Sequence, residues 1–383
     1  MENIKTIINV RPFVNGKIIE NCNITIKNGK ILAIGAQTEG EIIDCNNAIC
    51  CAGYIDIHTH GGFGKDCMES SYEALDKIAE YHLSTGITTF IPTTMTADIL
   101  DLKLAIDNIR HFNSTKARIY GAHLEGPFLD KKGAGAHPPQ YLLNPTEQNT
   151  QFIWENLDII KRITIAPNLD YSAQFCAEAT KNNIQISLGH DNAIDDEILA
   201  CVDNGATSVT HQYNCTSKPS RRENPKKHLG LTEIGLIEDR LVCEVIADDR
   251  HVPNNLFKMI YRIKGADNIC LVSDSLSVAG MPLGDYFIGS GQSAQTIRIE
   301  DGVAVLPSLN TYAGSITPIS KMVQNLHKLG IATIDCLKMA TLVPAKLIGM
   351  TDRGDIRPNM LADFNLLDDD LNIIATYING EKA

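Results

Sequence analysis

The chain contains one stretch that organises everything around it, Gly53-Tyr54-Ile55-Asp56-Ile57-His58-Thr59-His60-Gly61-Gly62. Apolar residues lead into two histidines separated by one residue, and side chains in a strand alternate between its two faces. We therefore expect His58 and His60 on one face, where two imidazoles can share a metal ion. Histidines at this spacing also occur as ordinary hydrogen-bonded strand residues, so the rest of the chain has to supply the partners.

Size and composition describe a globular protein with a large core, because 44% of the 383 residues are hydrophobic and 21% are charged. The net charge of -12, with no basic run longer than two residues, argues against a nucleic-acid partner and still allows an anionic metabolite. We expect no membrane association and a cytoplasmic location, since no signal pattern or bilayer-length apolar stretch occurs. The 11 cysteines form no Cys-x-x-Cys pair and are expected to be reduced buried thiols.

The two ends of the chain have the pattern of short β-strands. Alternating segments at 5–11, 16–20, 23–27 and 30–35 are separated by Asn-Gly turns at 15–16 and 28–29. Segments at 362–367 and 373–378 repeat this pattern near the C-terminus. We predict that residues 1–51 pair with residues 350–383 in a small β-sandwich domain.

Residues 52–349 alternate strands with helices, which is typical of a parallel βα barrel. The expected strands are 54–58, 88–92, 119–125, 163–166, 184–190, 208–211, 242–247 and 269–274. The expected helices are 72–85, 99–111, 173–181, 195–203, 255–263, 317–329 and 333–348, with a hairpin-like segment at 294–307. The predicted fold class is α/β, a (β/α)8 TIM-like barrel with a β-sandwich built from both chain ends.

Polar residues at the C-terminal ends of the predicted strands form the candidate site, because active sites of such barrels lie at that face. Besides the opening histidines, these strand ends carry Glu125, His190, His211 and Asp274. A single histidine in a strand is usually a hydrogen-bonded core residue. Several histidines and carboxylates at converging strand ends instead favour a divalent-metal site.

The same positions carry a family resemblance. The opening stretch, together with Ala-His-Leu-Glu-Gly-Pro-Phe at 122–128, Leu-Gly-His at 188–190, Thr-His-x-x-Asn at 210–214 and Val-Ser-Asp at 272–274, resembles the N-acetylglucosamine-6-phosphate deacetylases of the amidohydrolase superfamily. The resemblance covers nearly the whole chain in order, and His-Leu-Glu-Gly-Pro-Phe is its most specific block.

The resemblance implies how a metal would be held. Glu125, His190 and His211 match the main ligands of the family, whereas His58 and His60 match a second position that some members lose. One or two divalent ions per chain are thus allowed. Zinc suits this set of ligands best, and iron or another divalent ion is compatible. The opening pair would then decide between one metal and two.

The resemblance also assigns catalytic and substrate-binding roles. Asp274 would take a proton from water and pass it to the departing amine, and His137 would polarise the substrate carbonyl. Considered without the resemblance, the alternatives are that Asp274 caps the next loop and that His137 is a surface loop histidine. The positions that match substrate-contacting residues of the family are Ala136, His137, Asn214, Arg222 and His251.

Arg222 and His251 would hold a sugar phosphate, and an arginine suits phosphate through its two parallel charge-assisted hydrogen bonds. Without the resemblance, Arg221 and Arg222 could simply be solvated loop residues. Relatives build part of the phosphate site from a neighbouring subunit, so the resemblance implies a homodimer.

Departures from the family pattern leave the substrate open. Cys215-Thr216 replaces the usual Ala-Met, and Asp249 would repel a phosphate unless it is turned away or neutralised. The predicted activity is metal-dependent hydrolysis of the acetamide of N-acetylglucosamine 6-phosphate, a small amino-sugar phosphate. The alternatives are a deacetylase of a related substrate, such as N-acetylgalactosamine 6-phosphate, and a sugar-phosphate sensor without catalytic activity.

Overall fold

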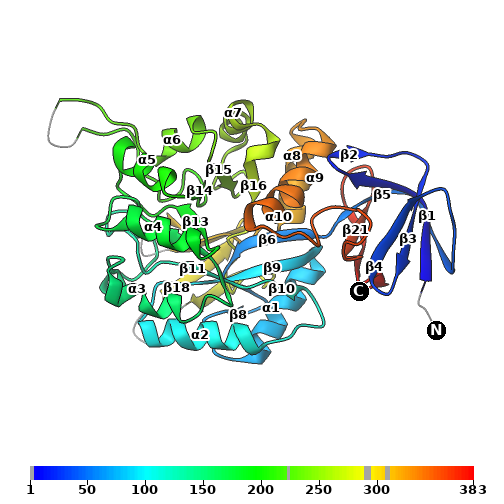
Figure 1. Cartoon of the computed structure of the whole chain (residues 1–383), viewed down its shortest axis with the longest axis horizontal. Coiled ribbons are helices and arrows are strands. Elements are labelled where there is room, and N and C mark those ends of the chain that lie inside the picture. Colours follow the sequence, from blue (N-terminus) through cyan, green and yellow to red (C-terminus); the bar gives the residue numbers. More distant parts are fainter. Residues whose placement is uncertain (1–3, 222–224, 289–294, 307–310) are drawn as a thin grey trace.

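The protein is described by a computed structural model that covers residues 4–221, 225–288, 295–306 and 311–383. A barrel of parallel strands ringed by helices forms its main body, and a sheet from the two chain ends lies at one side (Figure 1). In these described ranges no helix has the length and apolar character needed to cross a membrane.

The barrel strands pair in the order β10-β9-β11-β12-β13-β14-β15-β16, with β6 added to β9. Their bounds are β6 Tyr54–Thr59, β9 Ile87–Thr94, β10 Arg118–Ile119, β11 Ala122–Glu125, β12 Ile160–Ile165, β13 Gln185–Leu188, β14 Ala206–Val209, β15 Val242–Val245 and β16 Ile269–Leu271. The ring closes just beyond β16, where the Asp274 amide donates to the carbonyl of His58 at 2.9 Å. The predicted fold class is confirmed, and the predicted third strand is divided into β10 and β11.

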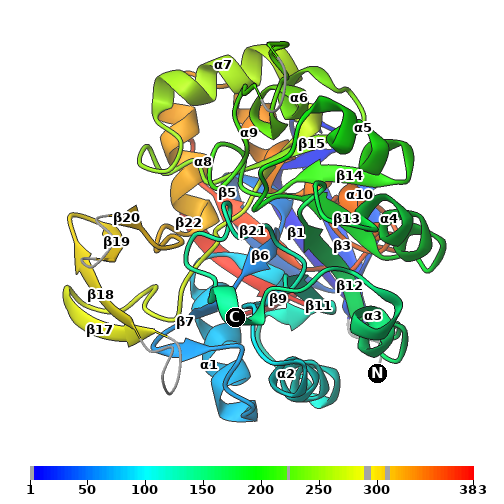
Figure 2. The same cartoon turned by 90° about the vertical axis from the view of Figure 1, so that its left-hand side faces the viewer.

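Helices pack around the outside of the strands (Figure 2). They are α1 Tyr72–Ser84, α2 Ile99–His111, α3 Glu147–Trp154, α4 Ser172–Lys181, α5 Asp195–Asp203, α6 Leu231–Ile237, α7 Asn254–Lys264, α8 Ile319–Lys328, α9 Thr333–Ala340 and α10 Leu342–Ile348, with short 3-10 turns at Pro139–Tyr141 and Ala266–Asn268. The sequence did not predict α3 and α6, which have eight and seven residues, because so few turns leave little apolar periodicity to detect.

Both chain ends contribute to one eight-stranded sheet. Its strands are β1 Ile4–Val14, β2 Lys17–Ile18, β3 Cys22–Lys27, β4 Lys30–Gly35, β5 Glu41–Ala52, β21 Phe364–Leu367, β22 Ile373–Ile378 and β23 Glu381–Lys382. The two ends meet where β21 runs antiparallel to β5, with Phe364 opposite Ala52. The predicted pairing of the ends is confirmed, while β5 and its parallel pairing with β1 were not predicted. The exact domain limits, 1–51 with 350–383 and 52–349, stay a proposal.

A small antiparallel sheet projects from the barrel at the side seen in yellow in Figure 2. Its strands are β17 Gly284–Ile288, β18 Gln295–Glu300, β19 Val303–Leu306 and β20 Thr311–Tyr312, and a further short pair joins β7 Gly61–Gly62 to β8 Lys65–Asp66. The predicted hairpin corresponds to β18 and β19, and its outermost residues, Ala294 and Pro307, lie outside the described residues.

Gly53 allows the chain to enter β6. A Cβ at this position would lie 2.0 Å from Oγ1 of Thr88, a buried residue of β9. We expect Gly53→Ala to lower the free energy of unfolding by about 3 kcal/mol, because a well-packed core has no room for an added methyl. Urea denaturation measures this loss.

Gly349→Ala is the matched control for Gly53→Ala. Gly349 has a φ of +75° and open space around its Cα, so an alanine there meets only backbone strain, about 1 kcal/mol. If Gly53→Ala cost no more than this control, Thr88 would be able to move aside and the packing argument would be wrong.

Candidate active site

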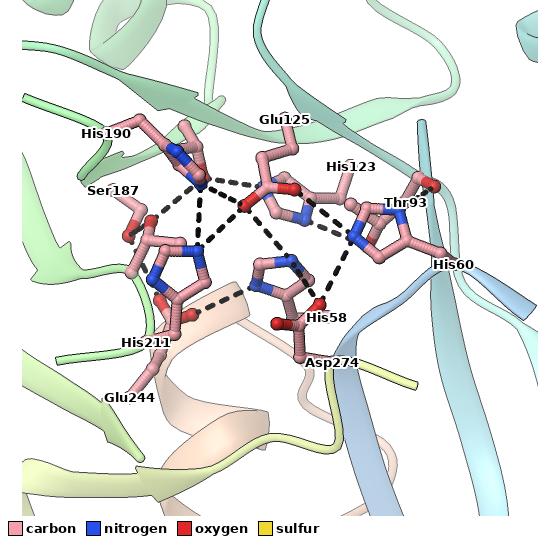
Figure 3. Close-up of polar contacts among 12 residues, drawn as sticks. His58, His60, Thr93, His123, Glu125, Ser187, His190, His211, Glu244 and Asp274 are labelled. Carbon is pink, nitrogen blue, oxygen red and sulfur yellow. Dashed lines mark hydrogen bonds and ion pairs between the residues drawn. The ribbon is translucent and has the colours of Figure 1, made fainter. Parts of the chain in front are cut away.

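The candidate site lies at the C-terminal ends of the barrel strands, where six predicted residues come together. Figure 3 shows His58, His60, Glu125, His190, His211 and Asp274 pointing toward one another, with His58 and His60 both from the end of β6 and the others from the ends of four further strands. All six are buried, with at most 8% of any residue exposed to solvent. The clustering expected from the strand ends is therefore present in the structure.

Three of these residues lie just beyond a strand and have unusual backbone conformations. The φ angles of His190, His211 and Asp274 are 51°, 30° and 47°. Residues other than glycine rarely adopt positive φ, and such strain is concentrated at functional sites. This conformation turns each side chain inward as its strand ends.

Glu125 is the centre of the cluster. Its Oε1 atom lies 3.1 Å from Nε2 of His190, 3.0 Å from Nε2 of His211 and 3.4 Å from Nε2 of His58. Its Oε2 atom lies 3.2 Å from Nε2 of His60. Burial acts to raise the pKa of Glu125, but the neighbouring histidines hold it well below its usual range. The carboxylate is ionised, and each of the four imidazoles turns its Nε2 atom toward it.

Hydrogen bonds to backbone carbonyls fix the tautomer of three histidines. Nδ1 of His60 contacts the carbonyl of Thr93 at 3.1 Å, and Nδ1 of His190 contacts that of Gly133 at 2.9 Å. Nδ1 of His211 contacts the carbonyl of Asn214 at 3.0 Å. A carbonyl can only accept, so each Nδ1 carries a proton and each Nε2 is left to bind a metal through its lone pair.

His58 lacks such a partner. Both of its ring nitrogens are buried without a hydrogen bond from any of the described residues. Its Nε2 lies 3.6 Å from Oδ1 of Asp274, and Nε2 of His60 lies 3.3 Å from the same oxygen. The ligand atoms of His58, His60 and Asp274 all lie within 4.8 Å of one another. A cation there would satisfy atoms that otherwise have no partner.

His137 belongs to the cluster but has the opposite tautomer. The backbone N–H of Thr96 donates to its Nδ1 at 3.3 Å, and the Thr96 hydroxyl lies 2.9 Å from that atom. An N–H can only donate, so the proton of neutral His137 is on Nε2, which lies 3.3 Å from Oε2 of Glu125. Although its distances also permit a metal, this tautomer makes His137 a hydrogen-bond donor.

The electrostatics of the cluster favour a cation. Burial acts to lower the pKa of His60, but Asp274 and Glu125 raise it to about 10. At His190, burial acts to lower the pKa, but Glu125 raises it well above its usual value. By contrast, burial lowers the pKa of His137 to about 4. Positive charge, as protons or as a metal ion, is therefore held beside the carboxylates, and His137 stays neutral.

Two of the predicted substrate-binding residues adjoin this cluster, Ala136 directly before His137 and Asn214 against His211. Ala136 packs beside the β17–β20 sheet, and the side-chain amide of Asn214 donates to the carbonyl of His211 at 3.3 Å. His251 places Nδ1 at 2.7 Å from Oδ2 of Asp248, and its buried Nε2 has no hydrogen-bond partner in the described part of the chain. Arg222 lies outside the described residues.

The side chain of Asp249 contacts the start of α7. Its Oδ1 accepts a hydrogen bond of 2.8 Å from the backbone N–H of Asn254, at the start of α7. A carboxylate at a helix N-terminus is stabilised by the unpaired amides there. This contact partly offsets the negative charge of Asp249, which is the charge that would repel a phosphate.

Two buried charged residues below the site were missed in the sequence. Arg162 and Glu244 are fully buried in β12 and β15 and form an ion pair inside the barrel. The available signal was a charged residue beside or within apolar strand residues, with Arg162 directly before Ile-Thr-Ile at 163–165 and Glu244 within Val-Cys-Glu-Val at 242–245.

Comparison of the sequence with known protein families gives a clear match. The model of the amidohydrolase family matches residues 49–383, which is most of the chain. The chain belongs to the amidohydrolase family. The prediction that it is an enzyme of this family is confirmed, and metal dependence agrees with the ligand groups found at the strand ends.

Relatives within the amidohydrolase family confirm the predicted resemblance. N-acetylglucosamine-6-phosphate deacetylases of Lysinibacillus sphaericus and Haemophilus influenzae are 30% and 31% identical over 94% and 96% of this chain, and over 93% of each relative. An N-acetylgalactosamine-6-phosphate deacetylase of Escherichia coli O157:H7 is 28% identical over 95% of both chains. The structure of the N-acetylglucosamine-6-phosphate deacetylase of Thermotoga maritima is 28% identical, covers 99% of both chains and has a TM-score of 0.84.

Proposed function

We propose that the protein is a metal-dependent deacetylase of N-acetylglucosamine 6-phosphate, giving glucosamine 6-phosphate and acetate. The observation that carries the proposal is the convergence of lone-pair-bearing Nε2 atoms on Glu125 and Asp274, next to a histidine held as a donor. The deacetylases among the relatives support the choice of substrate.

The residues present fit a divalent metal, because buried ring atoms of His58 are otherwise unsatisfied and backbone carbonyls fix three other imidazoles. Glu125, His190 and His211 would hold one ion, and His58, His60 and Asp274 would hold a second beside Glu125. Zinc is the proposed metal on its preference for nitrogen and carboxylate ligands. A bound divalent ion supplies a water of lowered pKa and polarises the amide carbonyl.

Asp274 and His137 divide the proton chemistry. Burial acts to raise the pKa of Asp274, but His58 and His60 lower it to about 2, so Asp274 is ionised at neutral pH, which is the form that can accept a proton from the attacking water. Asp274 then gives this proton to the amine, which leaves readily only when protonated. Nε2–H of His137 donates to the carbonyl oxygen, where negative charge develops.

The substrate end of the proposal involves the sugar and its phosphate. Asn214 and Ala136 border the metal-ligating residues, while His251 and Arg222 would bind the phosphate. His251 is held for this role by Asp248, which accepts its Nδ1 proton and leaves Nε2 free. The homodimer and the cytoplasmic location remain predictions, and light scattering of the purified protein tests the first.

Acetate release from a panel of sugars tests the function. We expect kcat/KM to be highest for N-acetylglucosamine 6-phosphate, lower for N-acetylgalactosamine 6-phosphate and lowest for the unphosphorylated sugars. A preference for the galactose isomer would favour the activity named for the Escherichia coli relative. Metal-loaded protein that binds the sugar phosphate without releasing acetate would make it a sensor.

The donor role of His137 gives a separate prediction. We expect His137→Asn to lower kcat by about 10²–10³-fold, the usual effect of removing one donor from a developing oxyanion. The metal content should not change, because Nε2 of His137 carries a proton and is not a ligand. Steady-state kinetics and elemental analysis of the same sample measure both.

Thr96→Val provides the control for His137→Asn. It removes the hydroxyl that contacts Nδ1 of His137 but keeps the backbone N–H that sets the tautomer. We expect kcat within a few-fold of the wild type. Loss of metal from His137→Asn would show that His137 is a ligand and would refute its assignment as a donor.

A further inference from the structure

Glu244 lies on β15, below the candidate site. One of its carboxylate oxygens accepts several hydrogen bonds, and the other accepts none from the described residues. Its Oε1 accepts hydrogen bonds from Ser187 at 3.0 Å and Ser208 at 3.1 Å and is also the partner of Nη2 of Arg162. Its Oε2 has no hydrogen-bond partner within the described ranges. That free oxygen lies 3.6 Å from Nδ1 of His58, as the dashed line between these residues in Figure 3 shows.

His58 differs from the other candidate ligands in what faces its Nδ1. His60, His190 and His211 each direct Nδ1 at a backbone carbonyl, whereas His58 directs it at a carboxylate. Both His58 and Glu244 are fully buried, so water does not reach the pair from outside. Two unsatisfied polar atoms that face each other in a dry interior are each the best available partner of the other.

We propose that Glu244 is a positioning residue, which accepts a hydrogen bond from Nδ1–H of His58 and thereby directs the Nε2 lone pair of His58 to the ion held with His60 and Asp274. This inference rests on the proposed metal-dependent function. A carboxylate behind a metal-binding imidazole fixes its tautomer and raises its basicity. Glu244 thus acts on the second metal position and leaves the one at His190 and His211 unchanged.

Arg162 makes this arrangement possible. Its guanidinium pairs with Oε1 of Glu244, and burial lowers the pKa of Arg162 only to about 10, so Arg162 stays protonated at neutral pH and offers its charge to the buried carboxylate. Its Nη1 also donates to the carbonyl of Ile57 at 3.2 Å, next to His58 in β6. The pair therefore fixes both the backbone before His58 and the ring of His58.

The test uses Glu244→Gln in the full chain, titrated with Zn²⁺ against a competing chelator. We expect two ions in the wild type and a 10–100-fold weaker affinity for one of them in the variant, with the other affinity unchanged. The ring ¹⁵N shifts of His58 should move from those of the Nδ1–H tautomer to those of the Nε2–H tautomer, because a glutamine amide can donate to Nδ1. A purely structural role would not change this tautomer.

Two further variants keep the proposal falsifiable. Ser208→Ala removes a donor to Oε1 but leaves Oε2 in place, so both affinities should stay within about twofold of the wild type. The double variant Arg162→Met/Glu244→Gln removes both members of the buried charge pair, so no unpaired arginine is left in the interior to destabilise the fold. This double variant should show the same loss of one affinity.

The outcomes separate this inference from the proposed function. If folded Glu244→Gln keeps both affinities, or if the wild type binds only one ion and the substitution does not weaken it, the positioning role is wrong even in an active deacetylase. If Glu244→Gln selectively weakens one ion while wild-type protein releases no acetate, the positioning role holds and the proposed deacetylase function fails.

Discussion

Asp274→Asn is expected to lower the rate of acetate release by about 10²–10⁴-fold while the protein keeps its fold and the ion held by Glu125, His190 and His211. In the described structure, Asp274 is the only carboxylate besides Glu125 that lies near both His58 and His60, at 3.6 and 3.3 Å. Asparagine retains an oxygen that can face these rings, but it cannot accept a proton from water. The loss should therefore appear in kcat.

Asparagine is also the substitution that the backbone tolerates at this position. Asp274 has a φ of 47°, and its N–H and carbonyl bond to His58 and Ser315 at 2.9 and 2.8 Å. Asparagine and aspartate adopt positive φ more readily than other residues, so an inactive variant should still be folded. Circular dichroism and elemental analysis accompany the kinetics.

Asp370→Asn is the matched control for Asp274→Asn, because Asp370 is an exposed carboxylate in the loop between β21 and β22. Its kcat should equal that of the wild type. If Asp274→Asn retained full activity, Asp274 could not be the group that transfers the proton.

Glu125→Gln is expected to remove bound metal and to reduce acetate release at least about 100-fold. The expectation follows from the position of this carboxylate between the two groups of histidines, with His190 and His211 on one oxygen and His60 on the other. Loss of a partner behind a ligand already costs 10–100-fold in affinity or activity, so loss of a ligand shared by two ions should cost more.

Elemental analysis after gel filtration and a chelator competition measure the metal content of Glu125→Gln. Glu155→Gln serves as the control, since Glu155 is an exposed carboxylate paired with Lys103 at 3.0 Å and lies away from the strand ends. We expect the control to keep its metal and its activity. Full metal content in Glu125→Gln would show that the histidines alone hold the ions.

The opening stretch shows how much of the site follows from local sequence. His58 and His60 have one residue between them, and the two-residue period of a strand puts both rings on one face without reference to the rest of the chain. Glu125, His190, His211 and Asp274 follow from a topological rule, because the C-terminal ends of parallel barrel strands lie on one face. The sequence was therefore sufficient to predict the barrel and the members of the cluster.

The tertiary structure decided what each member can do. His137 and His190 are both histidines near Glu125, yet a backbone N–H from Thr96 puts the proton of the first on Nε2, and the carbonyl of Gly133 puts that of the second on Nδ1. Glu244 faces His58 across 186 residues of sequence, a separation that no local pattern encodes. Hydrogen bonds depend on tenths of an ångström between atoms that only barrel closure brings together. The sequence by itself thus determined which residues gather at the strand ends, whereas folding determined the Glu244 contact beneath them and which of their atoms carry the protons.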